Sequence, residues 1–500
     1  MKSKWLPAAK LKTVIDQADA RWLMLIFPLL YLLVFFITSL LRVGFPYQLS
    51  WLEGVLMDHS RWILQGNQLY GPPAVEFTPF LYPPLYSYLS AFFMKIFGVH
   101  ILIPRLLSLV SSLLVLVLLW RLVKYETGSN FYALVAAGFY ASFYPFVRCY
   151  FDMVRVDAVF VFLLFLGVYI LRTAKKPYLI YLSAFVFYLA VFTKQQALPV
   201  AGMMGLFLLL HDFKKFLKFT LTFCLLSVIT ILYFQQASQG WFLFYVYKFP
   251  LSHGFRSHLV TLIFKDLFLH APVLVLMGPY LFFKAFKGKK DLRSRFIFYL
   301  FFFIAAFGIS WSSRAHAGGV ENVLMPILLC LSLLGAVSFW YFEQDIGASN
   351  KKGVYFAFLL IGLHFLILIY NPSSLIPSKE HYQWNKKFVD LIASFEGDVL
   401  VTQIGYIPTL AGKKTFAHMT AVNFAYSPGD VSAKAKRIIN RKFRKAIRRK
   451  QFSAIILRKN ESFFLSKMRG VYKWKGRFVT PIPLVLHGVM HQDWEIYVPK

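Results

Sequence analysis

A single carboxylate follows the first long apolar stretch of the chain, in the segment Ser50-Trp51-Leu52-Glu53. A serine followed three residues later by a glutamate is typical of a capping box, in which the carboxylate accepts a backbone N–H at the start of a helix. The N-terminus of a helix also keeps a carboxylate ionised, and an ionised carboxylate can act as a general base. Glu53 is therefore a candidate both for capping a helix over residues 51–65 and for accepting a proton.

Four further groups of charged and polar residues lie beside apolar segments, all on the same predicted side of the membrane. They are Arg148, Asp152, Arg155 and Asp157; Lys194; Lys248, His253, Arg256 and His258; and Arg314, His316, Glu321 and Asn322. An ionisable group at membrane depth is costly, so its default interpretation is functional. Simpler alternatives stay open, because Arg155 and Asp157 can form a local ion pair and Lys194 can extend its ammonium toward water.

Together with Glu53, Asp58 and Arg61 of the first loop, these groups predict one shared cavity. Several cations and a few carboxylates suit a substrate that has a phosphate and a lipid tail. Glu53 and Asp157 are the candidate catalytic residues, and Asp157 is also a candidate ligand for a divalent cation such as Mg²⁺ or Mn²⁺, although one carboxylate does not define a site. The candidate substrate-binding residues are Asp58, Arg61, Tyr82, Arg155, Lys194, Lys248, His253, Arg314, His316 and Asn322.

Long apolar segments must position these residues. The chain has 500 residues, of which 58% are apolar and only 15% are charged, against about 25% charged residues in an ordinary soluble domain. Segments near the ~20 residues that cross a bilayer predict a polytopic α-helical membrane protein with about eleven spans. The predicted spans are 22–42, 101–122, 130–147, 156–172, 178–193, 196–211, 218–236, 266–284, 296–313, 323–342 and 353–371.

The distribution of positive charge predicts the orientation of these spans. The net charge is +33, and the N-terminal tail and the loops on its side carry 21 Lys and Arg. The opposite loops carry fewer than half as many, despite their greater length. By the positive-inside rule the N-terminus is cytoplasmic, and eleven spans place the C-terminus outside. We expect a cell membrane location, the inner membrane of a bacterium.

Two regions are predicted along the chain. Residues 1–371 form the membrane bundle with a long first outer loop at 43–100, and residues 372–500 form a basic α/β domain with short strands in 397–405 and 452–458. Between these strands, residues 432–451 have helical spacing with dense basic charge on one face. Such a helix lies on anionic lipids, binds an anionic partner or is simply solvated. A domain outside the cell makes nucleic acid an unsuitable partner, and no nucleotide-binding glycine loop is present in the sequence.

The order of several motifs resembles a known superfamily. An acidic residue opens the first outer loop, and it is followed by ILQGNQLY (63–70), YPPLY (82–86), Arg-x-Asp (155–157), Thr-Lys (193–194) and GGVENVLMP (318–326). This series is similar to the GT-C glycosyltransferases, in particular the branch of the protein O-mannosyltransferases and the aminoarabinose–lipid A transferases. The resemblance covers most of residues 20–345.

The resemblance implies a reaction and assigns roles within it. Members take a sugar from a polyprenyl phosphate on the outer side of the membrane and pass it, with inversion, to an acceptor on a lipid, a glycan or a protein. Their first outer loop usually carries an Asp-Glu pair, which here reads Leu52-Glu53, so only Glu53 can inherit the role of base. Asp157 matches an acidic position of the second outer loop, and Lys194 matches a lysine associated with the donor phosphate.

Two other functional classes stay open. A transporter or flippase of lipid-linked sugars would also need a cationic cavity, and it is expected to have repeated halves or broken helices in matched positions. A membrane scaffold that displays the basic domain has no need of costly charges at the ends of its spans. The identities of the sugar and the acceptor do not follow from the sequence.

Overall fold

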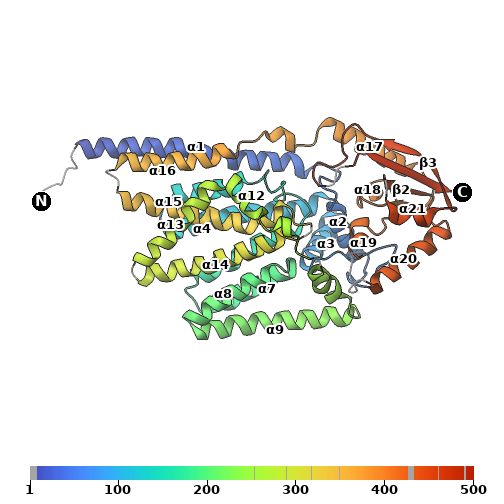
Figure 1. Cartoon of the computed structure of the whole chain (residues 1–500), viewed down its shortest axis with the longest axis horizontal. Helices are drawn as coiled ribbons and strands as arrows, with labels where there is room; N and C mark the ends of the chain where they lie inside the picture. The colour runs from blue at the N-terminus through green and yellow to red at the C-terminus, as the bar shows by residue number, and fades with distance from the viewer. Residues whose placement is uncertain are drawn as a thin grey trace.

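Apolar helices run side by side along the length of the molecule in the computed structural model (Figure 1). The structure describes residues 8–252, 254–288, 290–316, 318–347, 350–425, 433–459, 461–488 and 491–500. The helices of this bundle are α1 (Ala8–Val43), α4 (Leu102–Thr127), α5 (Asn130–Ser142), α6 (Val156–Thr173), α7 (Tyr178–Thr193), α8 (Ala197–His211), α9 (Phe213–Ala237), α12 (Leu262–His270), α13 (Pro272–Lys287), α14 (Lys290–Arg314), α15 (Met325–Ile346) and α16 (Lys351–Ile367).

Each of the eleven predicted spans overlaps one of these helices, except 266–284, which overlaps both α12 and α13. Within the described residues, six helices are long and apolar enough to cross a membrane, or up to eight if each of two bent pairs is one span, and three further apolar helices are shorter. The predicted span 266–284 is broken between α12 and α13, whose axes differ in direction by 97°. The break comes at Pro272, the first residue of α13, because proline suits the first turn of a helix but not its interior.

The start of α1 and the C-terminus lie at opposite ends of the molecule (Figure 1). The long loop after α1 forms α2 (Glu53–Leu64) and α3 (Leu85–Phe97) at the end that carries the C-terminal domain. α3 starts directly after Pro84, and it stops at Gly98, whose φ of 91° favours glycine. Residues 53–60 of α2 are buried between the bundle and the C-terminal domain.

Short helical elements complete the end of the bundle that faces the C-terminal domain, and others belong to the C-terminal region. In the bundle they are α10 (Trp241–Leu243), η1 (Phe244–Lys248), α11 (Phe249–Leu251), η2 (Ser257–Leu259) and η3 (Glu321–Leu324). After the bundle they are η4 (Pro372–Leu375), α18 (Ile407–Leu410), α19 (Met419–Ala425) and α21 (Ser462–Met468).

The C-terminal domain is built on a four-stranded mixed sheet in the order β1-β2-β4-β3. The strands are β1 (Val399–Val401), β2 (Ala454–Arg458), β3 (Tyr472–Val479) and β4 (Asp493–Pro499), of which only β1 and β2 are parallel. Side chains of β2 alternate between two apolar clusters. Ile455 packs with α20 (Ala433–Arg448), whereas Ile456 packs with α17 (Lys379–Ala393). The two helices therefore cover opposite faces of the sheet.

The C-terminal domain docks on the first loop of the bundle. The backbone N–H of Tyr406 donates to Oε1 of Gln48 over 3.0 Å, and the N–H of Ala417 donates to the carbonyl of Val75 over 2.8 Å. These hydrogen bonds place the domain over α2 and over the end of the bundle that holds the charged groups.

Candidate functional site

A cavity of about 560 Å³ opens at the end of the bundle that faces the C-terminal domain. Five of the predicted site residues line it, namely Tyr82, Arg155, Lys194, His316 and Asn322. Arg148 lines it as well, together with Gln195 and Gln196 directly after Lys194. Segments far apart in the sequence thus bring several cationic side chains to one space, as the charged groups predict.

Asp157 lies behind the side chains that line the cavity, and it holds the cationic side chains among them in place. Its Oδ1 accepts hydrogen bonds from Nζ of Lys194 over 2.7 Å and from Nδ2 of Asn322 over 2.8 Å. Its Oδ2 accepts from Nε of Arg155 over 3.3 Å. The carboxylate is 1% exposed, and both of its oxygens are engaged. This geometry gives Asp157 a positioning role rather than contact with a substrate.

The donors around Asp157 do not fit a divalent cation. A cation would compete there with an ammonium and a guanidinium, and the oxygen ligands that Mg²⁺ and Ca²⁺ require are not grouped around it. Among the described residues, no group of three or more His, Cys, Asp or Glu side chains could hold a metal ion.

Arg155 presents an unused donor beside the cavity. Its Nη2 donates to the Tyr82 hydroxyl over 3.0 Å, and its guanidinium lies 4.8 Å from the ring centre of Tyr150. Its Nη1 is buried without a hydrogen-bond partner. A buried donor without a partner is costly, so an anion in the cavity would satisfy it. The cavity can thus hold an anionic head group by the charge-assisted bonds that phosphate favours.

Glu53 does not line the cavity. Its oxygens accept from Nε and Nη2 of Arg105 over 2.9 and 2.7 Å, and from the backbone N–H groups of Leu49 and Val154 over 2.6 and 2.9 Å. Burial alone would raise the pKa of Glu53, but the charge and hydrogen bonds of Arg105 outweigh it and hold this pKa below its ordinary value. The carboxylate is ionised, fully buried and fully bonded.

The capping interpretation of Glu53 describes part of this geometry. The carboxylate accepts the Ser50 N–H over 3.4 Å, as in a capping box, but the Ser50 hydroxyl caps nothing and has no hydrogen-bond partner. The main partner of the Glu53 carboxylate is Arg105 of α4, so Glu53 connects the start of α2 to the bundle. A general-base role for Glu53 stays a prediction that this conformation does not support.

Asp58 and Arg61 lie under the C-terminal domain instead of in the cavity. Nη1 of Arg61 donates to the Thr415 hydroxyl over 3.2 Å and lies 3.5 Å from Oδ1 of Asp58. Burial raises the pKa of Asp58 to about 7 against the opposing effects of Arg61 and Thr415. Their predicted role in substrate binding is not supported by this position, because the domain covers α2.

The remaining predicted residues lie behind or beside the cavity. Nε of Arg314 is 2.8 Å from Oδ2 of Asp266, and its Nη1 donates to the carbonyl of Gly319, so Arg314 supports the loop that carries His316. Glu321 joins this support by ion pairs with Arg148 and Arg314. Lys248 is exposed and does not line the cavity. His253 lies outside the described residues.

The cavity wall also includes a contact between the first loop and the C-terminal domain that the sequence does not predict. Trp51 and Gly488 both line the cavity, and Gly488 comes from the C-terminal domain. A side chain at Gly488 would collide with the Trp51 indole, and the φ of Gly488 is 92°. The sequence gives no signal for this contact, because it joins residues more than 400 positions apart.

The comparisons with known proteins agree with this architecture. A family model described as dolichyl-phosphate-mannose-protein mannosyltransferase matches residues 82–235. ArnT of Cupriavidus metallidurans bound to undecaprenyl phosphate is similar in structure, with a TM-score of 0.58, 12% identity, and coverage of 94% of this chain and 97% of that chain. Its apo form also gives a TM-score of 0.58 at 12% identity, with 96% and 98% covered.

A further match is more distant. The oligosaccharyltransferase of Archaeoglobus fulgidus tethered to an acceptor peptide gives a TM-score of 0.50 at 13% identity, covering 90% of this chain and 73% of that chain. No curated protein sequence matches the chain. The family model and the shared fold nevertheless agree with the order of the sequence motifs. The chain therefore has the fold of the GT-C glycosyltransferases, the superfamily that its motifs resemble.

Proposed function

We propose that this chain is an integral membrane glycosyltransferase that moves a sugar from a polyprenyl-phosphate-linked donor to an acceptor. The main support is the cavity at the end of a GT-C bundle, where Arg148, Arg155 and Lys194 converge. The asymmetry of Lys and Arg among the loops supports an outer-face location for this end. The acceptor is a lipid, a glycan or a protein.

The cationic wall would act on the leaving group. As the acceptor hydroxyl attacks the anomeric carbon, the bond to the lipid phosphate breaks and negative charge grows on the phosphate oxygens. Lys194 and the free Nη1 of Arg155 are positioned to stabilise that charge, a contribution that is often the largest in catalysis. Asp157 keeps both cations oriented before the substrate binds, so little reorganisation is needed during the reaction.

A single displacement of this kind inverts the anomeric centre and needs a base for the hydroxyl proton. The resemblance assigns that base to Glu53, which would first have to leave Arg105. An activated phosphate leaving group needs no general acid, which fits a wall that has several cations and no free carboxylic acid among the described lining residues.

Substitution of Lys194 tests the proposal. We expect Lys194→Gln to weaken polyprenyl-phosphate binding at least about tenfold, because a charge-assisted bond to phosphate is lost, and to reduce transfer from radiolabelled lipid-linked sugars in nanodiscs. Lys248→Gln is the matched control, since this lysine lies near the same end, is exposed and does not line the cavity. Equal effects of both substitutions would contradict the proposed role of the cavity. Movement of the intact donor across the membrane, without sugar transfer, would favour a flippase.

A further inference from the structure

Helix α20 carries a dense basic surface that the proposed reaction does not use. Its sequence from Ala433 to Arg448 contains eight Lys and Arg and no Asp or Glu. Its inner face is apolar and packs on the sheet through Ile439, Phe443 and Ile447. Its outer face forms a shallow groove of about 580 Å³, here called the basic groove, lined by Arg437, Asn440, Arg441, Arg444, Lys445, Arg448 and Arg449.

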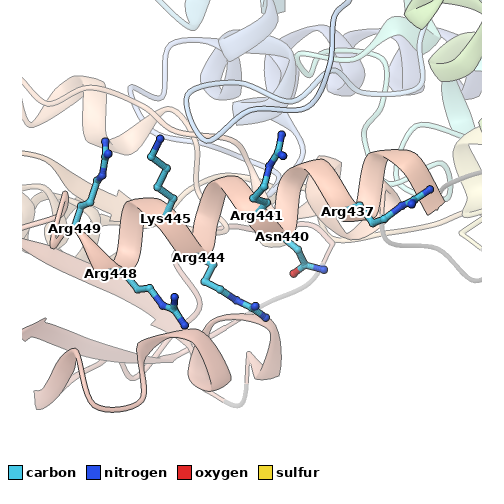
Figure 2. A pocket seen from close by; sticks show the side chains of 7 residues that line it. All are labelled: Arg437, Asn440, Arg441, Arg444, Lys445, Arg448 and Arg449. Atoms are coloured by element: carbon cyan, nitrogen blue, oxygen red, sulfur yellow. The ribbon is translucent and has the colours of Figure 1, made fainter.

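The side chains of the basic groove stand in two rows (Figure 2). Arg441, Lys445 and Arg449 project from one edge of the helix, whereas Arg444 and Arg448 project from the other. Like charges four residues apart destabilise a helix. Among the described residues, none of these five side chains forms an ion pair, and the cations of this domain that do form one include Arg458, Lys459 and Arg477.

The positive charge of the groove affects a neighbouring residue. Burial, together with the charge of Arg444, lowers the pKa of the Lys467 ammonium to about 8. Lys467 belongs to α21, which packs beside α20 through Phe464 and Phe443. An anion between the two helices would relieve this repulsion. The groove is therefore complementary to a ligand with several negative charges.

The direction of α20 indicates whether the ligand of the basic groove is a lipid surface or a polymer. Near its start, the Lys434 ammonium lies 5.6 Å from the ring centre of Trp241, which follows α9 of the bundle. Just beyond its end, Nζ of Lys450 donates to the carbonyl of Lys500 over 2.7 Å. The helix thus runs from the bundle toward the C-terminal tip of the molecule (Figure 1). A helix that rises away from the bilayer cannot lay its whole length on the head groups.

The length of the basic groove fits an extended ligand. Arg437 and Arg448 are separated by a rise of about 16 Å along the helix, which is more than one phosphate group can span. We propose that the basic groove binds a linear polyanion, a polymer whose repeating units carry phosphate or carboxylate groups, on the side of the membrane where the C-terminal domain lies. This binding does not depend on the proposed glycosyl transfer.

A binding assay without any sugar donor tests this proposal. The full-length protein in nanodiscs of zwitterionic lipid is titrated with linear inorganic polyphosphate over a range of salt concentrations. We expect saturable binding that weakens with salt, and a dissociation constant at least about tenfold higher for Arg441→Gln/Lys445→Gln/Arg449→Gln, because charge-assisted bonds to phosphate are among the stronger polar contacts. Unchanged affinity in this variant would overturn the proposal.

A matched variant removes three charges from the other face of the sheet. Lys386→Gln/Lys387→Gln/Lys473→Gln alters exposed lysines of α17 and β3, and it should bind polyphosphate like the wild type. An equal loss of affinity would show attraction to net charge alone and would contradict a site on α20. Thermal unfolding of both variants verifies that they fold.

Hydrogen exchange distinguishes binding of a polymer from binding of lipid head groups. Polyphosphate should slow the exchange of residues 433–449 in zwitterionic nanodiscs, whereas a change to anionic lipid without polyphosphate should leave these residues unchanged. Protection by anionic lipid alone would assign the basic groove to head groups and would refute the polymer proposal.

Discussion

Glu53 shows how the same residue type can serve structure or chemistry according to its partner. Its carboxylate accepts two hydrogen bonds from Arg105 in a fully buried site, and the backbone N–H groups of Leu49, Ser50 and Val154 complete the set. The removal of one partner from a buried ion pair leaves an uncompensated charge and costs about 3–5 kcal/mol. Glu53 is thus expected to contribute to stability whether or not a substrate is present.

We predict that Glu53→Gln lowers the melting temperature of the purified protein, because Arg105 loses its counter-charge. The double variant Glu53→Gln/Arg105→Met should recover part of the lost stability, since no unpaired charge remains in the buried site. Thermal unfolding in detergent measures both effects. A Glu53→Gln protein that keeps its stability and its donor binding but loses transfer would instead establish Glu53 as the base.

The residues of the cavity were predicted better than their roles. Arg155, Lys194, His316 and Asn322 could be grouped because each lies at the end of an apolar segment, where a charge is costly. The place of Glu53 could not be predicted in the same way. Its partner, Arg105, is 52 positions away on another helix, and only packing decides which oxygens remain free.

At the scale of elements, α2 lies between the bundle and the C-terminal domain and contacts both. Asp58 belongs to this helix, and burial raises its pKa to about 7. The unfolded chain loses the proton of Asp58 near the ordinary value of about 3.9, whereas the folded chain keeps it until about pH 7. The stabilising effect of this proton is therefore complete at low pH and is lost as the pH rises toward 7.

We predict that the protein becomes more stable when the pH falls from 7 to 5, with Asp58 contributing about 2 kcal/mol over this range. Asp58→Asn should remove this part of the pH dependence, because the amide does not titrate, and should be at least as stable as the wild type at pH 7. Melting temperatures of both proteins between pH 5 and pH 8 provide the measurement. An identical pH dependence in the two proteins would contradict a buried, protonated Asp58.

The helices were more predictable than the sheet. Apolar length located the helices of the bundle, six to eight of which are long enough to cross a membrane among the described residues, and alternating or continuous apolar residues located β1 and β2. β3 and β4 went unpredicted: β3, with the sequence YKWKGRFV, carries exposed charges at a sheet edge. Charges protect an edge strand from further pairing, and they also hide it from a search for buried strands.

At the scale of the whole molecule, the C-terminal domain helps to form the cavity. Gly488 of this domain lies against Trp51 of the first loop, and both residues line the space. The domain therefore supplies part of the cavity wall, in addition to carrying the basic helix α20.

We predict that Gly488→Ala reduces kcat/KM for sugar transfer at least several-fold, because the added Cβ would displace the Trp51 indole from the cavity wall. Gly470→Ala is the matched control, since Gly470 also has a positive φ of 79° but has no neighbour within 4 Å of the added Cβ. Both substitutions place an alanine at a positive φ, whereas only Gly488→Ala brings the added Cβ against Trp51. Equal activity of the two variants would exclude a role for this contact.

The central claim is that the cationic wall of the cavity receives the lipid phosphate of the donor. A cryo-EM structure of the protein in nanodiscs that contain a polyprenyl phosphate tests it most directly. We expect the phosphate within hydrogen-bond distance of Lys194 and of Nη1 of Arg155, with Asp157 still bonded to both cations. A phosphate bound elsewhere, with the cavity filled only by water, would contradict the claim.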